Sequence, residues 1–320
     1  MYAYPAQYMQ PPEPPRTPIG VKWTVVALAI YLPFMAVSIV VSIYTYSVLS
    51  NLPSGGFVEL FSALAALALV SAITVIFGVL VLIFYFIGFG YLYGGRNEMG
   101  PAHARNLKIA LPLLIVAFSL DLAGRVASFF ITSSAITFDF FSGRITFNPN
   151  ALYLGVVVST TVGILVAAMC AAVLVLSVRA LAKPGHQTLL YAAAGIGTAT
   201  PGIAGALALL QLPRLVATIQ DFVDSGGGGG FFGFVPSIDP ALGVPALVMS
   251  GLGLVTGLLY FVVYRAAGER LKTGELKPVL PPAAPVTPWM PTAPYAYGPP
   301  PPAPMAPPAQ PAEPPAQPPA

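Results

Sequence analysis

The chain has 320 residues, of which 56% are hydrophobic and only 8% are charged, and its formal net charge is +3. A soluble globular domain carries roughly 25% charged residues, so this composition argues against a water-soluble fold and predicts a protein dissolved in a lipid bilayer. The basic residues are spread over several loops rather than gathered on one face, which argues against nucleic acid as a partner.

The first 20 residues are rich in proline and tyrosine, and Arg16 is their only basic residue. They lack the charged start of a signal peptide, and the apolar run that follows is longer than the hydrophobic region of such a peptide. We therefore expect no cleavage, and we interpret residues 1–20 as a disordered tail that precedes the first membrane span.

Six apolar segments follow, and each is longer than the roughly 18 residues that a helix needs to cross a membrane. They cover about residues 23–49, 60–93, 109–133, 151–181, 188–212 and 241–266. The pattern predicts an all-α membrane protein in which residues 21–272 form a bundle of six transmembrane helices.

The positions of lysine and arginine predict the orientation, because these residues accumulate in cytoplasmic loops. If the N-terminus is cytoplasmic, eleven of the 14 basic residues fall on the cytoplasmic side. They are Arg16, Lys22, Arg96, Arg105, Lys108, Arg179, Lys183, Arg265, Arg270, Lys272 and Lys277. Only Arg144 and Arg214 fall outside, and Arg125 lies within a span. The sequence thus predicts a multi-pass protein of the cell membrane with both termini in the cytoplasm.

Three connecting segments have patterns of their own. Between Ala135 and Phe147, large apolar residues alternate with smaller or polar ones around Ser142-Gly143, which predicts a β-hairpin. Residues 213–223 place their apolar side chains on one helical face, which predicts an interfacial helix on the outer leaflet. The glycine run 226–230 lacks the Lys-Ser/Thr pair of a P-loop, so we interpret it as a flexible linker.

The C-terminal segment, residues 273–320, is dominated by proline, which makes up 19 of the last 43 residues. Such a chain cannot build a helix or a sheet, so we expect a disordered tail of polyproline II character. It could dock on a cytoplasmic polyproline-binding protein, or it could be a solvated tail that keeps the cytoplasmic face soluble. Both alternatives remain open at this stage.

Asp121 and Arg125 lie within the third span, close to its centre. A charge at that depth costs on the order of 3 kcal/mol, so each needs compensation. Their spacing of four residues places them on the same helical face, within reach of an ion pair. The pair is either a structural ion pair that fixes the register of the helices or part of a proton or ion pathway.

Glycine and proline also mark the fifth and sixth spans. Pro201 is flanked by Gly197 and Gly202, which predicts a kinked helix that either packs closely or lines a binding site. Gly253 and Gly257 form a Gly-x-x-x-Gly pair, a close-packing face for a neighbouring helix or for a second copy in a homo-oligomer.

Catalytic signals are absent from the sequence. His103 and His186 fall in different inner loops without a second ligand at metal spacing, so we interpret them as solvated loop residues. Cys170 lies inside a span and is interpreted as a small core residue. We therefore expect no catalytic residues, no metal, no cofactor and no enzymatic activity.

In composition and layout the whole chain resembles the uncharacterised multi-spanning membrane proteins of thermophilic archaea, which join helices rich in Ala, Val and Gly to Pro/Tyr-rich tails. This resemblance implies no activity. The first hypothesis for function is an interaction or scaffold protein that displays its polyproline tails in the cytoplasm. The alternative is an ion or small-solute transporter or channel that uses Asp121 and Arg125.

Overall fold

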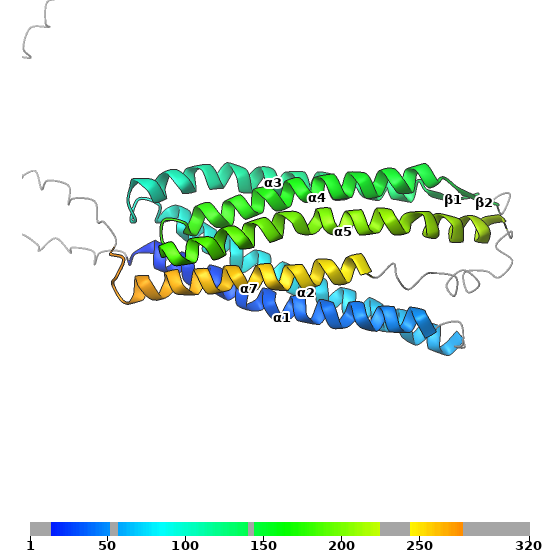
Figure 1. Ribbon diagram of the computed structural model, residues 1–320, viewed down its shortest axis with the longest axis horizontal. Coiled ribbons are helices and arrows are strands. Elements are labelled where there is room, and N and C mark those ends of the chain that lie inside the picture. The colour runs from blue at the N-terminus through cyan, green and yellow to red at the C-terminus, as the bar shows by residue number, and fades with distance from the viewer. Residues whose placement is uncertain (1–13, 52–56, 140–143, 225–243, 278–320) are drawn as a thin grey trace, which may run out of the picture. The chain divides into compact units, whose positions relative to one another are not determined.

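The computed structural model describes residues 14–51, 57–139, 144–224 and 244–277 (Figure 1). Within these ranges the chain forms six long helices and one β-hairpin, which confirms the predicted fold class. The elements are α1 (Arg16–Asn51), α2 (Phe57–Gly94), α3 (Pro101–Ser133), β1 (Ile136–Asp139), β2 (Arg144–Phe147), α4 (Pro149–Val178), α5 (Pro184–Asp224) and α7 (Val244–Lys272). The tail segments before residue 14 and after residue 277, and the glycine linker 226–230, lie outside the described residues.

Each helix packs against two neighbours. α3 lies on α4, α4 on α5, α5 on α7, α7 on α1 and α1 on α2, and α2 also contacts α3. One end of the bundle holds the α2–α3 and α4–α5 connections and the last residues of α7, and we call it the basic end (Figure 1). The opposite end holds β1 and β2, and we call it the hairpin end. Helices that follow one another in the sequence run in opposite directions between these two ends.

The surface of the bundle is apolar. All six helices are long and apolar enough to cross a membrane. Many large apolar side chains are not covered by protein; Leu210 is 76% exposed, Phe129 67% and Phe130 66%. Soluble proteins rarely expose large contiguous apolar patches, so lipid is the solvent in which this surface is stable. The chain is an integral membrane protein.

The buried apolar core lies in the half of the bundle nearest the basic end. It joins the beginnings of α1, α3 and α5 to the ends of α2, α4 and α7, through side chains that other helices cover almost completely. Its largest members include Val21, Leu92, Leu107, Val178, Leu190, Val263 and Tyr264. Tight packing is therefore concentrated at one end of the bundle.

α1 and α2 approach closely through small residues. A Cβ atom at Gly20 would lie 2.6 Å from the backbone nitrogen of Leu92, and one at Gly88 would lie 2.8 Å from the backbone nitrogen of Thr24. Thr24 Oγ1 donates to the Gly20 carbonyl oxygen across 3.0 Å, so its hydroxyl group is satisfied within its own helix. Glycine at these positions lets the two backbones come together, as small residues do in membrane bundles.

The beginning of α1 is capped by a carboxylate from the α2–α3 connection. Glu98 accepts hydrogen bonds from the backbone nitrogens of Arg16 (2.8 Å) and Thr17 (2.9 Å). Thr17 Oγ1 in turn donates to the Gly95 carbonyl oxygen across 3.0 Å. The first N–H groups of a helix have no intrahelical partner, so Glu98 satisfies two donors that would otherwise need water.

We expect Glu98→Ala to lower the free energy of unfolding by about 1 kcal/mol, the usual cost of losing a helix N-cap. Glu269→Ala is the matched control, because Glu269 only forms an exposed i, i+4 ion pair with Arg265 at 3.2 Å, which contributes roughly 0.3–0.5 kcal/mol. Denaturant unfolding of both variants in detergent micelles measures the difference. Equal losses in the two variants would contradict the cap.

The predicted hairpin is confirmed between α3 and α4. β1 pairs with β2 antiparallel, with Ile136 opposite Phe147 and Asp139 opposite Arg144. The backbone nitrogen of Asn148 donates to the Ala135 carbonyl oxygen across 2.7 Å, which closes the base of the hairpin. The turn at Ser142-Gly143 lies outside the described residues.

Several helix limits differ from the predicted ones. α1 begins at Arg16, so the last five residues of the predicted tail 1–20 are helical, and the described residues after Lys272 form a turn rather than a disordered chain. α5 continues through Pro213 to Asp224, so residues 213–223 extend the fifth helix instead of forming a separate interfacial one. Proline removes one hydrogen bond, which neighbouring groups in a membrane bundle can replace, and the helix therefore does not have to end there.

Candidate functional site

The Asp121–Arg125 ion pair is formed along one face of α3. Arg125 Nε donates to Asp121 Oδ2 across 2.7 Å, one helical turn apart. Other helices leave 77% of the Arg125 side chain and 38% of the Asp121 side chain uncovered. The pair is therefore not sealed inside the protein, and the remaining polar atoms of both groups are open to whatever fills the space beside α3.

The ion pair belongs to a longer polar stripe on α3. Asp121, Arg125, Ser128 and Thr132 follow at spacings of four, three and four residues, which places all of them on one face of the helix. The adjacent face carries Gly124, where a Cβ atom would lie 2.5 Å from Val162 Cγ1 of α4. Close packing at Gly124 thus directs the stripe toward the space next to the α3–α4 contact.

This space is a pocket of about 800 Å³ that four helices line. α3 contributes the polar stripe, α4 contributes Ser159 and Thr160, α5 contributes Pro201, and α7 contributes Met249. The α3 and α7 residues lie in the half of the bundle nearest the hairpin end, away from the tightly packed core. The charged pair therefore faces a mostly apolar pocket with a few polar groups rather than a packed interface.

The pocket contains a charged and a neutral side chain whose hydrogen-bonding groups are not fully used. Arg125 uses only its Nε, and its two Nη groups form no hydrogen bond or ion pair within the part of the chain that the structure describes. Ser128 Oγ is buried and likewise has no partner among the described residues. Buried polar atoms are nearly always paired, so Ser128 Oγ points to a ligand or to water in the pocket, where the open Nη groups of Arg125 can also bind.

The fifth helix presents Pro201 to this pocket, while its predicted neighbours serve packing. A Cβ atom at Gly197 would lie 3.1 Å from Thr256 Cγ2 of α7, and one at Gly202 would lie 3.4 Å from Ile164 Cδ1 of α4. α5 is one continuous helix through Pro201. Of the three predicted residues, the structure thus places only Pro201 beside Asp121 and Arg125.

Gly253 and Gly257 pack within the chain, against α1. A Cβ atom at Gly257 would lie 2.6 Å from Cε1 of Tyr31, and one at Gly253 would lie 3.0 Å from Met35 Sδ. The Gly-x-x-x-Gly face is therefore occupied by an intramolecular contact. A homo-oligomer, which the sequence leaves open, would have to use another surface.

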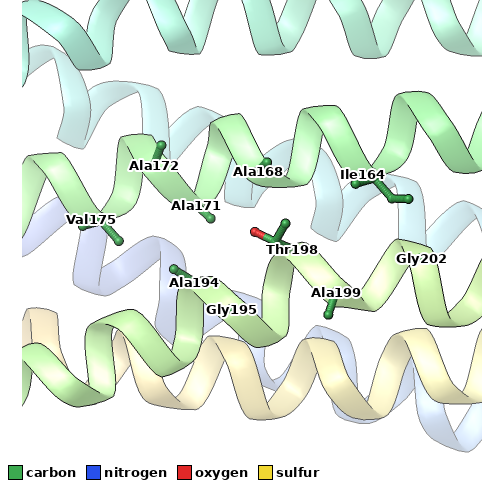
Figure 2. Close-up of a pocket in the computed structure, with 10 residues that line it drawn as sticks. All are labelled: Ile164, Ala168, Ala171, Ala172, Val175, Ala194, Gly195, Thr198, Ala199 and Gly202. Carbon is green, nitrogen blue, oxygen red and sulfur yellow. The ribbon is translucent and has the colours of Figure 1, made fainter.

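A second pocket, of about 660 Å³, lies between α4 and α5 (Figure 2). The residues that line it are Ile164, Ala168, Ala171, Ala172, Val175, Ala194, Gly195, Thr198, Ala199 and Gly202. Thr198 is the single polar side chain among them, and none of them also lines the pocket at Asp121. This groove therefore lacks the groups that would bind a charged or strongly polar molecule.

The interpretation of His103 as a solvated loop residue is wrong. α3 begins at Pro101, eight residues before the predicted span, so His103 lies in its first turn and is fully buried. His186 is half-buried near the start of α5. Among the described residues, no group of three or more His, Cys, Asp or Glu side chains is placed to hold a metal ion.

No protein-family model, curated protein or solved structure matches this chain. The resemblance to archaeal membrane proteins therefore stays a prediction.

If the pocket holds water, a cysteine in it will react with a charged maleimide that cannot enter lipid. In a Cys170→Ala background, we expect rapid labelling of Thr132→Cys, which lines the pocket, and slow labelling of Phe130→Cys. Phe130 is the matched control, because it lies two residues away on the opposite, apolar face of α3 and is 66% exposed. Equal labelling of the two positions would show that the pocket is not a separate aqueous space.

Proposed function

We propose that this protein is a carrier or channel that moves a small polar solute across the cell membrane, with the pocket beside Asp121 and Arg125 as its binding site. The observation that carries the proposal is the ion pair on the wall of an open pocket of about 800 Å³ in a membrane bundle. Ionisable residues within spans are costly, and they mark substrate or ion pathways in many membrane proteins.

The lining of the pocket supports binding more than packing alone. Hydroxyl groups from two helices, at Ser128 and Thr132 of α3 and at Ser159 and Thr160 of α4, line the same space as the charged pair. Ligand sites combine a mostly apolar wall with a small number of polar groups that fix the orientation of the ligand. A purely structural ion pair would not need this second set of polar groups around it.

The charge balance of the site favours a particular class of solute. Asp121 and Arg125 neutralise each other, so the pocket offers N–H donors and carboxylate oxygens without a net charge. A lone cation or anion would be attracted by one partner and repelled by the other. A solute that carries both donors and acceptors, such as a zwitterion, can pair with both at once.

The distribution of basic residues supports an orientation for transport. Eleven of the 14 lysines and arginines belong to the segments at the basic end and in the adjoining tails. By the positive-inside rule this end and both termini are cytoplasmic, and the pocket then lies in the outer half of the membrane. A solute would bind from outside and leave toward the cytoplasm.

The scaffold hypothesis rests on the proline-rich tails, which lie outside the described residues. A scaffold needs no polar cavity within its bundle. The pocket at Asp121 is therefore the specific observation that favours transport over a scaffold role.

The proposal is tested by a flux screen on the purified protein in liposomes. We expect uptake of at least one class among amino acids, small sugars and monovalent ions, and we expect zwitterionic amino acids to be favoured. Arg125→Gln should abolish this uptake because it removes the positive charge that pairs with the carboxylate of a zwitterionic solute.

Arg265→Gln is the matched control for the flux screen. Arg265 also forms an i, i+4 ion pair, with Glu269, but it lies near the basic end and does not line the pocket. We expect full uptake by this variant. Uptake no greater than in protein-free liposomes for every class, together with no stabilisation of the protein by any of these solutes, would overturn the proposed function.

A further inference from the structure

A row of hydroxyl groups lies along α7, on the face of the helix that lines the pocket nearer the hairpin end. Thr256, Tyr260 and Tyr264 follow one another at intervals of four residues, about 6 Å along the helix axis each. Thr256 is seven residues beyond Met249, on the same face of the helix, and Met249 lines the pocket. The row therefore begins about two helical turns from the pocket, on its basic-end side, and runs toward the basic end.

At its far end the row reaches α4 through short hydrogen bonds. Tyr264 is fully buried, its Oη lies 2.6 Å from Ser177 Oγ, and it donates to the Leu174 carbonyl oxygen across 2.9 Å. Ser177 Oγ also lies in donating position 3.0 Å from the same carbonyl. Tyr264 and Ser177 each have one hydroxyl hydrogen, but three hydrogen-bond contacts join them to each other and to the Leu174 carbonyl oxygen. Either hydroxyl can therefore be the donor in the bond between them.

The two members of the row nearest the pocket, Thr256 and Tyr260, have buried hydroxyl groups without a hydrogen-bond partner among the described residues. Tyr260 is 3% exposed, and the atoms concerned are its Oη and Thr256 Oγ1. Leaving such groups unpaired is costly, and water is the usual partner of buried hydroxyls that protein atoms do not reach. Consecutive members of the row are about one helical turn apart, so their side chains lie on the same face of α7.

Two further polar side chains lie in the neighbourhood of this row. The Cys170 thiol of α4 lies within electrostatic range of both the Asp121 carboxyl group and the Tyr260 hydroxyl. Tyr85 of α2 lies within range of Cys170, Tyr260 and Tyr264. Polar side chains of α2, α4 and α7 therefore lie near one another in the packed half of the bundle.

We propose that Thr256, Tyr260, Tyr264 and Ser177, with bridging water molecules, form a proton path from the pocket at Asp121 to the basic end. This inference rests on the proposed function, because it supplies the pocket with a route through the packed half of the bundle. In each step one O–H bond breaks and one forms on the next oxygen, while a proton enters at one end and leaves at the other. No oxidant or reductant is needed.

The experiment measures proton entry into liposomes that contain a pH-sensitive dye, driven by a potassium diffusion potential. We expect the wild-type protein to conduct protons above protein-free liposomes. Tyr260→Phe keeps the ring and removes the hydroxyl, and we expect it to lower the proton flux about tenfold, the effect of one lost hydrogen bond in the path. Tyr91→Phe is the control, since Tyr91 is 40% exposed on α2, and it should conduct like the wild type.

Thr256→Val is a second, isosteric variant that keeps the test valid if Tyr260→Phe does not fold, and we expect it to lower the flux as well. No proton flux above protein-free liposomes, or full flux in the folded Tyr260 and Thr256 variants, would overturn the path. Solute uptake without proton flux would overturn the path but leave the proposed function standing. Proton flux without uptake or binding of any solute would support the path and overturn the proposed function.

Discussion

Asp121→Asn is expected to lower the free energy of unfolding by about 2–3 kcal/mol, because it leaves the Arg125 charge without its partner at membrane depth. Arg125→Gln should lower the free energy of unfolding by a similar amount, because it leaves the Asp121 carboxylate without its partner. The two side chains are joined by a hydrogen bond of 2.7 Å, and each change removes the attraction between opposite charges that strengthens it. Denaturant titration of the protein in lipid-containing micelles measures both losses.

The double variant, Asp121→Asn with Arg125→Gln, should be more stable than the sum of the two single losses predicts. Neither remaining side chain carries a charge, so the largest cost disappears, and residues in contact are known to couple in this way. The matched pair is Arg265 and Glu269, which is also an i, i+4 pair but is exposed near the basic end. Its removal should cost roughly 0.3–0.5 kcal/mol.

Stability and transport should separate in these variants. If the pair binds solute, all three variants lose uptake, and the double variant loses it although its stability is largely restored. If the double variant instead transports like the wild type, the pair only holds α3 in place, and the binding site has to lie elsewhere in the bundle.

The number of helices and their approximate positions could be predicted from the sequence, because lipid demands long apolar runs and closed backbone hydrogen bonding. The exact ends could not. Pro101, Pro149 and Pro184 each begin a helix, since proline is tolerated in the first turn, where no N–H partner exists. Hydropathy takes no account of this effect, and so α3 begins eight residues before the predicted span and contains the buried His103.

The candidate site could be predicted only in part. The i, i+4 spacing of Asp121 and Arg125 is a local property of one helix, and the ion pair forms as that spacing predicts. Ser128 and Thr132 were missed, although their spacing of seven and eleven residues from Asp121 marks the same face of α3. The pocket itself depends on how α4, α5 and α7 approach α3, and residue spacing along one helix does not predict that approach.

Gly88→Ala should destabilise the protein by about 1–3 kcal/mol, the usual cost of inserting a methyl group where there is no room. A Cβ atom at this position would lie 2.6 Å from Thr24 Oγ1 and 2.8 Å from the Thr24 backbone nitrogen. A flexible side chain could move away from such a contact, but the backbone of α1 cannot move alone. α1 and α2 have to separate, which loosens the packing around Val21 and Leu92 in the buried core.

Gly90→Ala is the control, two residues away on the same helix, because a Cβ atom there meets nothing within 4 Å. Alanine favours a helix over glycine by roughly 0.5–1 kcal/mol, so this variant should be at least as stable as the wild type. The two substitutions are chemically identical and should have effects of opposite sign. Denaturant unfolding in micelles decides between them, and a similar response to both would mean that α1 and α2 are not in backbone contact at Gly88.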